Sequence, residues 1–183
     1  MRRRQLLLIA AASTAVASVS AAGYAALGSA SDMNVGFECT GPAGFKITGK
    51  TTELGVTEEN GNVVVTVGLG KLSTGIDLRD HHMRDKYLEV GKFPTTTLTI
   101  ARSALKVPAT GRAEGDAAGT LQLHGVSRPV TVHYDASAEG AGFLAHGKFR
   151  INMNEYGIVV PSYLGITVKP DVDVNASFRV AGN

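Results

Sequence analysis

The chain is poor in several residue types that stabilise or mark other classes of protein. It has no tryptophan and a single cysteine, Cys39, so no internal disulfide can form and the fold must be held together by its core. We expect Cys39 to be a buried, inert thiol. Charged residues make up only 19% and the formal net charge is +2, which gives no argument for nucleic-acid binding. Hydrophobic residues at 44% and 22 glycines instead predict a single turn-rich β domain with a real core.

The N-terminus differs in composition from the rest of the chain. Arg2 to Arg4 form a basic start, Leu6 to Val19 an apolar run, and Ser20 to Ala22 a small-residue cleavage site. This order predicts a signal peptide over residues 1–22, with cleavage as late as residue 30 also acceptable. The alternative is an uncleaved membrane anchor, because apolar character continues to Leu27. We therefore expect an exported, periplasmic protein whose folded domain covers residues 33–183.

Apolar and polar residues alternate in segments that are separated by turn signals such as Asn60-Gly61 and His124-Gly125. Successive side chains of a strand point to opposite faces of its sheet, so the apolar parity marks the buried face. About eight strands emerge, the longest over residues 166–180 with a bend at Pro170. We predict a mainly β fold, an eight-stranded antiparallel up-and-down barrel. Its inward-facing side chains include Val65, Val67, Leu98, Ile100, Leu121, Leu123, Val130, Val132, Phe143, Phe149, Ile166, Val168 and Phe178.

One segment breaks the β pattern. Residues 77–89 place apolar side chains roughly on one helical face, and Gly91 and Pro94 follow as helix-ending residues. Asp77 is placed to cap the first turn, and Asp80 adds a negative charge near the positive end of the helix. We predict one amphipathic helix.

Residue patterns that would carry chemistry are weak. His81 and Asp85 lie four residues apart on the predicted helix, but two ligands do not make a metal site. There is no G-x-S-x-G motif and no Cys/His pair near in sequence. We predict no metal site, no catalytic residue and a protein that is not an enzyme. The inward set, with few large aromatic and several small residues, allows either a lined tunnel or a filled core.

Three motifs resemble those of the YceI-like family. TGIDLRDHHMR from Thr74, with Tyr87-Leu88 and Lys92 to Pro94 after it, resembles the helix-containing segment of that family. GTLQLHGVSRPV, which starts at Gly119, is similar to a hairpin of that family. INMNEYGI, which starts at Ile151, is similar to the end of one of its late strands. One departure is at Ser31 to Val35, where the family has an Asp-x-x-His-Ser step and this chain has no histidine.

The resemblance implies an exported, lipocalin-like barrel with a helix over one side. It implies a tunnel that holds a polyisoprenoid, an isoprenoid quinone or a fatty amide, lined by the inward set above. His82 falls in the helix motif and joins the ligand-binding residues that we predict. No cofactor is expected besides a bound isoprenoid or other long-chain lipid.

The resulting hypothesis is a non-enzymatic carrier of a long apolar chain. Membrane contact would serve ligand exchange, and the oligomeric state stays open, a homodimer included. One alternative is a lipid-modifying enzyme on the same barrel, for which Tyr134 and Tyr163 are the modest inward polar candidates. The other is a stress-related binding module whose barrel core is filled.

Overall fold

The computed structural model describes residues 29–163 and 166–182, so the proposed signal peptide lies outside the described residues. A nine-stranded antiparallel sheet has the order β2-β1-β11-β8-β7-β6-β5-β4-β3, and β9 and β10 form a separate hairpin. The strand bounds are β1 Ala30–Thr40, β2 Lys46–Thr51, β3 Leu54–Glu59, β4 Asn62–Gly68, β5 Thr95–Ala101, β6 Arg112–Leu123, β7 Val126–Glu139, β8 Gly142–Asn152, β9 Ser162–Tyr163, β10 Ile166–Thr167 and β11 Asp171–Val180. Short 3-10 turns cover Pro42–Gly44, Arg102–Ala104 and Met153–Tyr156.

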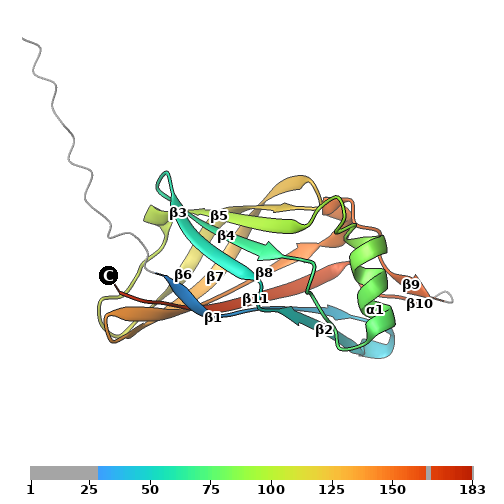
Figure 1. Ribbon diagram of the computed structural model, residues 1–183, viewed down its shortest axis with the longest axis horizontal. Coiled ribbons are helices and arrows are strands. Elements are labelled where there is room, and N and C mark those ends of the chain that lie inside the picture. The colour runs from blue at the N-terminus through green and yellow to red at the C-terminus, as the bar shows by residue number, and fades with distance from the viewer. Residues whose placement is uncertain (1–28, 164–165, 183) are drawn as a thin grey trace, which may run out of the picture.

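The sheet curls until its edge strand β3 lies beside β1, which gives a half-barrel (Figure 1). Val35 of β1, Leu54 of β3 and Val67 of β4 are buried together at this contact. Within the described ranges no hydrogen-bonded ladder joins the two edge strands β2 and β3. Side-chain packing therefore completes the wall where backbone pairing does not.

Apart from the 3-10 turns, the described residues contain one helical segment, which stands across one end of the curled sheet, beside the β9–β10 hairpin (Figure 1). It begins as the α-helix α1, Asp77–His81, and continues as a π-helical turn, His82–Tyr87. We call residues 77–87 the cap helix. It is two residues shorter than the predicted segment 77–89. The predicted side-chain cap by Asp77 is wrong, because the N-cap residue is Ile76 and no side chain caps it.

The mainly β, antiparallel barrel-like fold with one helix is confirmed, but the strand count is nine rather than eight. The additional strand is β3, whose apolar alternation is limited to Leu54 and Val56. The predicted strand 166–180 is divided, because Ile166–Thr167 pairs with β9 and the main sheet resumes at Asp171. The chain bends at Pro170, whose carbonyl accepts a hydrogen bond from the Met153 amide.

The β6–β7 hairpin shows how local sequence sets the geometry at the capped end. His124 and Gly125 both have positive φ, at 51° and 76°, as a two-residue hairpin turn requires. A Cβ at Gly125 would lie 2.8 Å from the Phe93 ring, so glycine is required for space as well as for φ. The His124 ring packs against Phe93 with centroids 4.5 Å apart.

Candidate functional site

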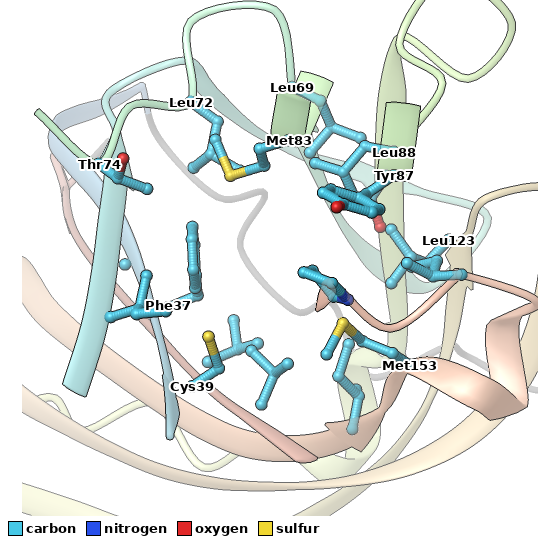
Figure 2. A pocket seen from close by; sticks show the side chains of 18 of the residues that line it. Phe37, Cys39, Leu69, Leu72, Thr74, Met83, Tyr87, Leu88, Leu123 and Met153 are labelled. Atoms are coloured by element: carbon cyan, nitrogen blue, oxygen red, sulfur yellow. The ribbon is translucent and has the colours of Figure 1, made fainter. Parts of the chain in front are cut away.

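An apolar cavity of about 650 Å³ lies between the concave face of the sheet and the cap helix. This volume falls within the range of roughly 300–1,000 Å³ that is usual for small-molecule sites. Figure 2 shows Phe37, Cys39 and Met153 on one side of the space, with Leu72, Met83 and Leu88 across from them. A filled core, the second alternative from the sequence, therefore does not describe this end of the barrel.

Alternation along the strands supplies most of the wall. On β1 the side chains that line the cavity are those of Val35, Phe37 and Cys39, each two positions after the last. Because side chains two residues apart on a strand point to the same face, apolar residues at every second position form a continuous apolar surface. The same spacing on the other strands gives the lining residues Val65, Val67, Leu121, Leu123, Val172 and Val174.

The cap helix and the loops next to it form the opposite wall. Met83, Tyr87 and Leu88 come from the helix and its end, and Leu69 and Leu72 from the loop that precedes it. All five pack against or belong to the largest buried cluster, which also contains Met153 and Tyr156. The cap helix is therefore part of the cavity wall rather than a lid outside it.

The few polar side chains of the lining lie near the cap. Thr74, Arg79 and His82 come from the cap helix and the turn before it, Ser162 from β9, and Thr96 from the start of β5, where its hydroxyl donates to the Gln122 carbonyl. Arg79 donates from Nε to the Thr74 hydroxyl at 2.7 Å and from Nη2 to the Thr74 carbonyl at 2.9 Å. The polar end of an amphipathic ligand would find its hydrogen-bonding partners here, while the strands beneath offer mainly apolar contact.

A buried carboxylate holds the cap helix in place. Asp80 is 4% exposed; its Oδ2 accepts from the Ser73 hydroxyl at 2.6 Å, and its Oδ1 from the Thr74 amide at 2.7 Å and hydroxyl at 2.5 Å. Burial raises the pKa of Asp80, but these hydrogen bonds and the charge of Arg84 outweigh it and lower the pKa from 3.8 to about 2. Ser73 in turn pairs with Lys50 of β2 through both backbone hydrogen bonds. The network thus ties the helix to the edge of the sheet.

His124 holds the residues that follow the C-terminal end of the cap helix. Its Nε2 lies 3.0 Å from Oε2 of Glu89, and its Nδ1 lies 3.1 Å from the Tyr156 carbonyl oxygen. Arg128 of the same hairpin donates from Nε to the Glu155 carbonyl at 2.9 Å. These contacts join the three motifs that carried the resemblance, and they give His124 and Arg128 structural roles.

Cys39 is buried, as predicted, but it lies in the cavity wall. Burial raises the pKa of the Cys39 thiol, and the charge of Arg79 acts in the opposite direction. Because the thiolate is the reactive form, a raised pKa slows alkylation at neutral pH. As the only cysteine of the chain, it can report on the cavity.

The structure brings some of the predicted binding residues together and separates others. Those that line the cavity are Val65, Val67, Leu98, Leu121, Leu123, Phe149, Val168 and His82. Ile100 and Val132 do not line it, because they form a second buried cluster with Ala117, against which Val130 packs. Phe178 packs instead against the cluster at the β1–β3 contact, and Phe143 is half-buried outside the lining. The side chain of Ile166 is outside the described part of the structure.

Several lining residues were absent from the predicted set. Phe37 and Cys39 belong to a short alternating segment that the sequence pattern marks, so they could have been included. Met83 and Tyr87 lie on the apolar face of the predicted helix. Leu69 continues the alternating run of Val63, Val65 and Val67, so it could also have been included. Leu72, Met153 and Ile158 lie in loops or turns without a period, and no local signal identifies these three.

The inward tyrosine considered for an enzyme does not reach the cavity. The Tyr134 hydroxyl accepts a hydrogen bond from the Lys106 amide, and Tyr134 is not part of the lining. The side chain of Tyr163 is outside the described part. Within residues 29–163 and 166–182, no group of three or more His, Cys, Asp or Glu side chains could hold a metal ion. In the same ranges no helix is both long and apolar enough to cross a membrane.

Comparison with known proteins gives consistent matches. The sequence model of the YceI-like domain matches residues 24–180. The chain is 31% identical over 125 residues to a UPF0312 protein of Pseudomonas fluorescens, covering 63% of this chain and 62% of that protein. It is 35% identical over 98 residues to Protein YceI of Salmonella arizonae, covering 49% of each. The matches thus span about half to three fifths of the length of these curated relatives.

Solved structures share the fold. A polyisoprenoid binding domain from Saccharophagus degradans, implicated in plant cell wall breakdown, aligns with a TM-score of 0.71 at 17% identity, over 86% of this chain and 99% of that one. BcnA of Burkholderia cenocepacia aligns with a TM-score of 0.64 at 14% identity, over 80% and 95%. At such low identity these likenesses establish the architecture alone.

Proposed function

Because the chain belongs to the family of YceI-like domains, we propose that it is a non-enzymatic carrier or sequestering protein for a long apolar chain. The ligand classes that we favour are a polyisoprenoid, an isoprenoid quinone or a fatty amide. The observation that carries the proposal is the cavity, whose wall is almost entirely aliphatic, aromatic or thioether and whose polar groups lie near one end. The polyisoprenoid binding domain from Saccharophagus degradans, with the same fold, supports this ligand class.

The mechanism is burial of the ligand tail. Each CH₂ removed from water contributes about 0.8 kcal/mol, so a tail of several prenyl units binds tightly with few polar contacts. Arg79, His82 and Thr74 at the cap end would receive the head group, which fixes the orientation of the ligand with its tail toward the strands.

Exchange of the ligand with a membrane is part of the proposal. Ile76 and Leu78 are 54% and 68% exposed although both also line the cavity. Phe45 and Val159 are 64% and 65% exposed and lie within three residues of the lining residues Pro42 and Ile158. Exposed apolar side chains beside an apolar cavity favour contact with an apolar partner. We call these four residues the rim, and a bilayer would supply and receive tails through it.

Export also belongs to the proposal, because it depends on the N-terminal sequence alone. Residues 1–22 would be removed as the protein enters the periplasm. Cell fractionation together with the intact mass of the mature protein tests this step. A membrane-bound protein that still contains residue 1 would contradict cleavage and indicate an uncleaved membrane anchor.

The central experiment is organic extraction of the purified protein followed by mass spectrometry. We expect a long-chain isoprenoid or lipid that stays with the protein through gel filtration. The protein freed of ligand should then bind an added isoprenoid quinone, measured by displacement of a hydrophobic dye. An empty preparation that also refuses quinones, prenols and fatty amides contradicts the proposed function.

A further inference from the structure

The cavity occupies only the capped half of the barrel, and its lower limit can be followed strand by strand. On β8 the lining includes Ile151 and Phe149 but not Gly147, the next residue on that face. On β5 it includes Thr96 and Leu98 but not Ile100. On β11 it reaches Ala176 but not Phe178. We call Leu98, Phe149 and Ala176 the floor.

Side chains of β5, β6 and β7 form a packed layer beneath the floor, and Phe178 of β11 packs in the cluster at the β1–β3 contact. Ile100, Ala117 and Val132 are 5%, 1% and 4% exposed, and both Leu98 and Phe149 pack directly against them. A Cβ at Gly119 would lie 2.9 Å from Cγ1 of Ile100 and 3.2 Å from Cδ1 of Leu98, which shows how closely these side chains cover the β6 backbone. A ligand tail that enters from the cap end meets this packed layer.

Phe149 is the largest side chain of the floor, and the residues beyond it on β8 are small. Gly147 and Ala145 follow on the same face, and Gly147 lies opposite Tyr134 of β7, which lies opposite Gly115 of β6. Removal of the Phe149 ring would deepen the cavity by the volume that the ring occupies, down to the layer of Ile100, Ala117 and Val132 against which it packs. Ala176 is the converse case, since a larger side chain there would raise the floor.

We propose that Phe149 sets the longest tail that the cavity can hold, so that it determines the chain-length specificity of the protein. The inference rests on the proposed function and adds a limit to it. Up to the limit, each added CH₂ is buried and affinity rises about fourfold per CH₂. Past the limit, the extra carbons stay at the cap end in contact with water, and affinity stops rising.

The test uses a homologous series of straight-chain primary alcohols with ligand-free full-length protein. Displacement of anilinonaphthalene sulfonate reports binding without tryptophan background, since the chain has none. The wild type should show a break in affinity against tail length. Phe149→Ala should move the break to longer tails, Phe149→Leu should move it less, and Ala176→Ile should move it to shorter tails.

Phe143→Ala is the matched control. Phe143 lies on the same strand and the same face as Phe149, pairs with Val180 and is not part of the lining. We expect its break at the wild-type length, with both Phe variants checked for folding by circular dichroism. An unmoved break in folded Phe149→Ala or Phe149→Leu, or an equal movement in Phe143→Ala, overturns the inference. If the wild type binds no alcohol of any length and no quinone, the proposed function itself fails.

Discussion

Replacement of Asp80 by asparagine tests whether a single buried carboxylate holds the cap helix over the cavity. Asp80 accepts hydrogen bonds from Ser73 and from both the amide and the hydroxyl of Thr74. Asparagine keeps the size of the side chain, but one of its two terminal atoms becomes a donor facing donors. The variant therefore loses the negative charge and leaves a buried amide NH₂ without an acceptor, which lowers the free energy of unfolding.

The magnitude follows from the lowered pKa. The pKa of Asp80 falls from 3.8 to about 2, and each pKa unit corresponds to about 1.4 kcal/mol, so the native network favours the charged carboxyl by about 2 kcal/mol. A carboxyl with a lowered native pKa adds stability above its unfolded pKa and loses it as the pH falls through its native pKa. The difference in unfolding free energy between wild type and Asp80→Asn should thus narrow by about 2 kcal/mol as the pH falls from neutral through 3.8 to about 2.

The assay is urea unfolding followed by far-ultraviolet circular dichroism at a series of pH values. Asp85→Asn provides the control, because Asp85 lies on the same helix with its side chain 75% exposed and 3.5 Å from His81. Its effect should stay below about 0.5 kcal/mol at every pH, as for other exposed pairs. A gap between wild type and Asp80→Asn that is independent of pH would refute the reasoning, since it would show that the charge of Asp80 contributes nothing.

The remaining predictions concern the cavity and its rim. Cys39 should be alkylated far more slowly than a free thiol at neutral pH, and faster as the pH rises, because burial raises its pKa. A bound isoprenoid should slow the alkylation further. Equal alkylation rates with and without ligand would place the ligand tail outside the cavity. Phe45→Asp together with Val159→Asp should slow ligand transfer between vesicles severalfold. The affinity for the ligand should stay unchanged, because neither residue lines the cavity. An unchanged transfer rate would show that the rim has no part in ligand exchange. Phe149→Ala should lengthen the longest tolerated tail, as the alcohol series measures.

Period-two alternation predicts the faces of the strands well, for a physical reason. The concave face of a curled sheet excludes water along its whole length, so apolar residues recur at every second position whether the space they face is filled or empty. Val132 and Leu121 obey the same pattern, yet Val132 packs in a filled layer and Leu121 lines the cavity. The alternation could identify both as inward, and could not tell which of them a ligand would reach.

The features that the sequence did not reveal depend on contacts between distant segments. The sequence pattern predicts that the Asp80 carboxylate stabilises the start of the helix. In the structure it accepts hydrogen bonds from Ser73 and Thr74, so it stabilises the turn before the helix. Strand β3 is an edge strand that carries only two apolar alternating residues, Leu54 and Val56, and it takes its place through contact with the distant strand β1. Neither local pattern nor propensity encodes such placements.

Two arrangements together explain why the capped half of the barrel is hollow and the other half is not. In the filled half, side chains of the neighbouring strands β5, β6 and β7 pack against one another without a helix above them, as Ile100, Ala117 and Val132 do. In the capped half, the cap helix stands between them and supplies its own wall from Met83, Tyr87 and Leu88. Because the Asp80 network and the Ser73–Lys50 pairing fix one end of that helix to β2, and the His124–Glu89 contact fixes the other, the helix cannot settle inward to close the space. The cavity is thus maintained by polar anchors at its capped end, while its apolar wall remains free to bind a tail.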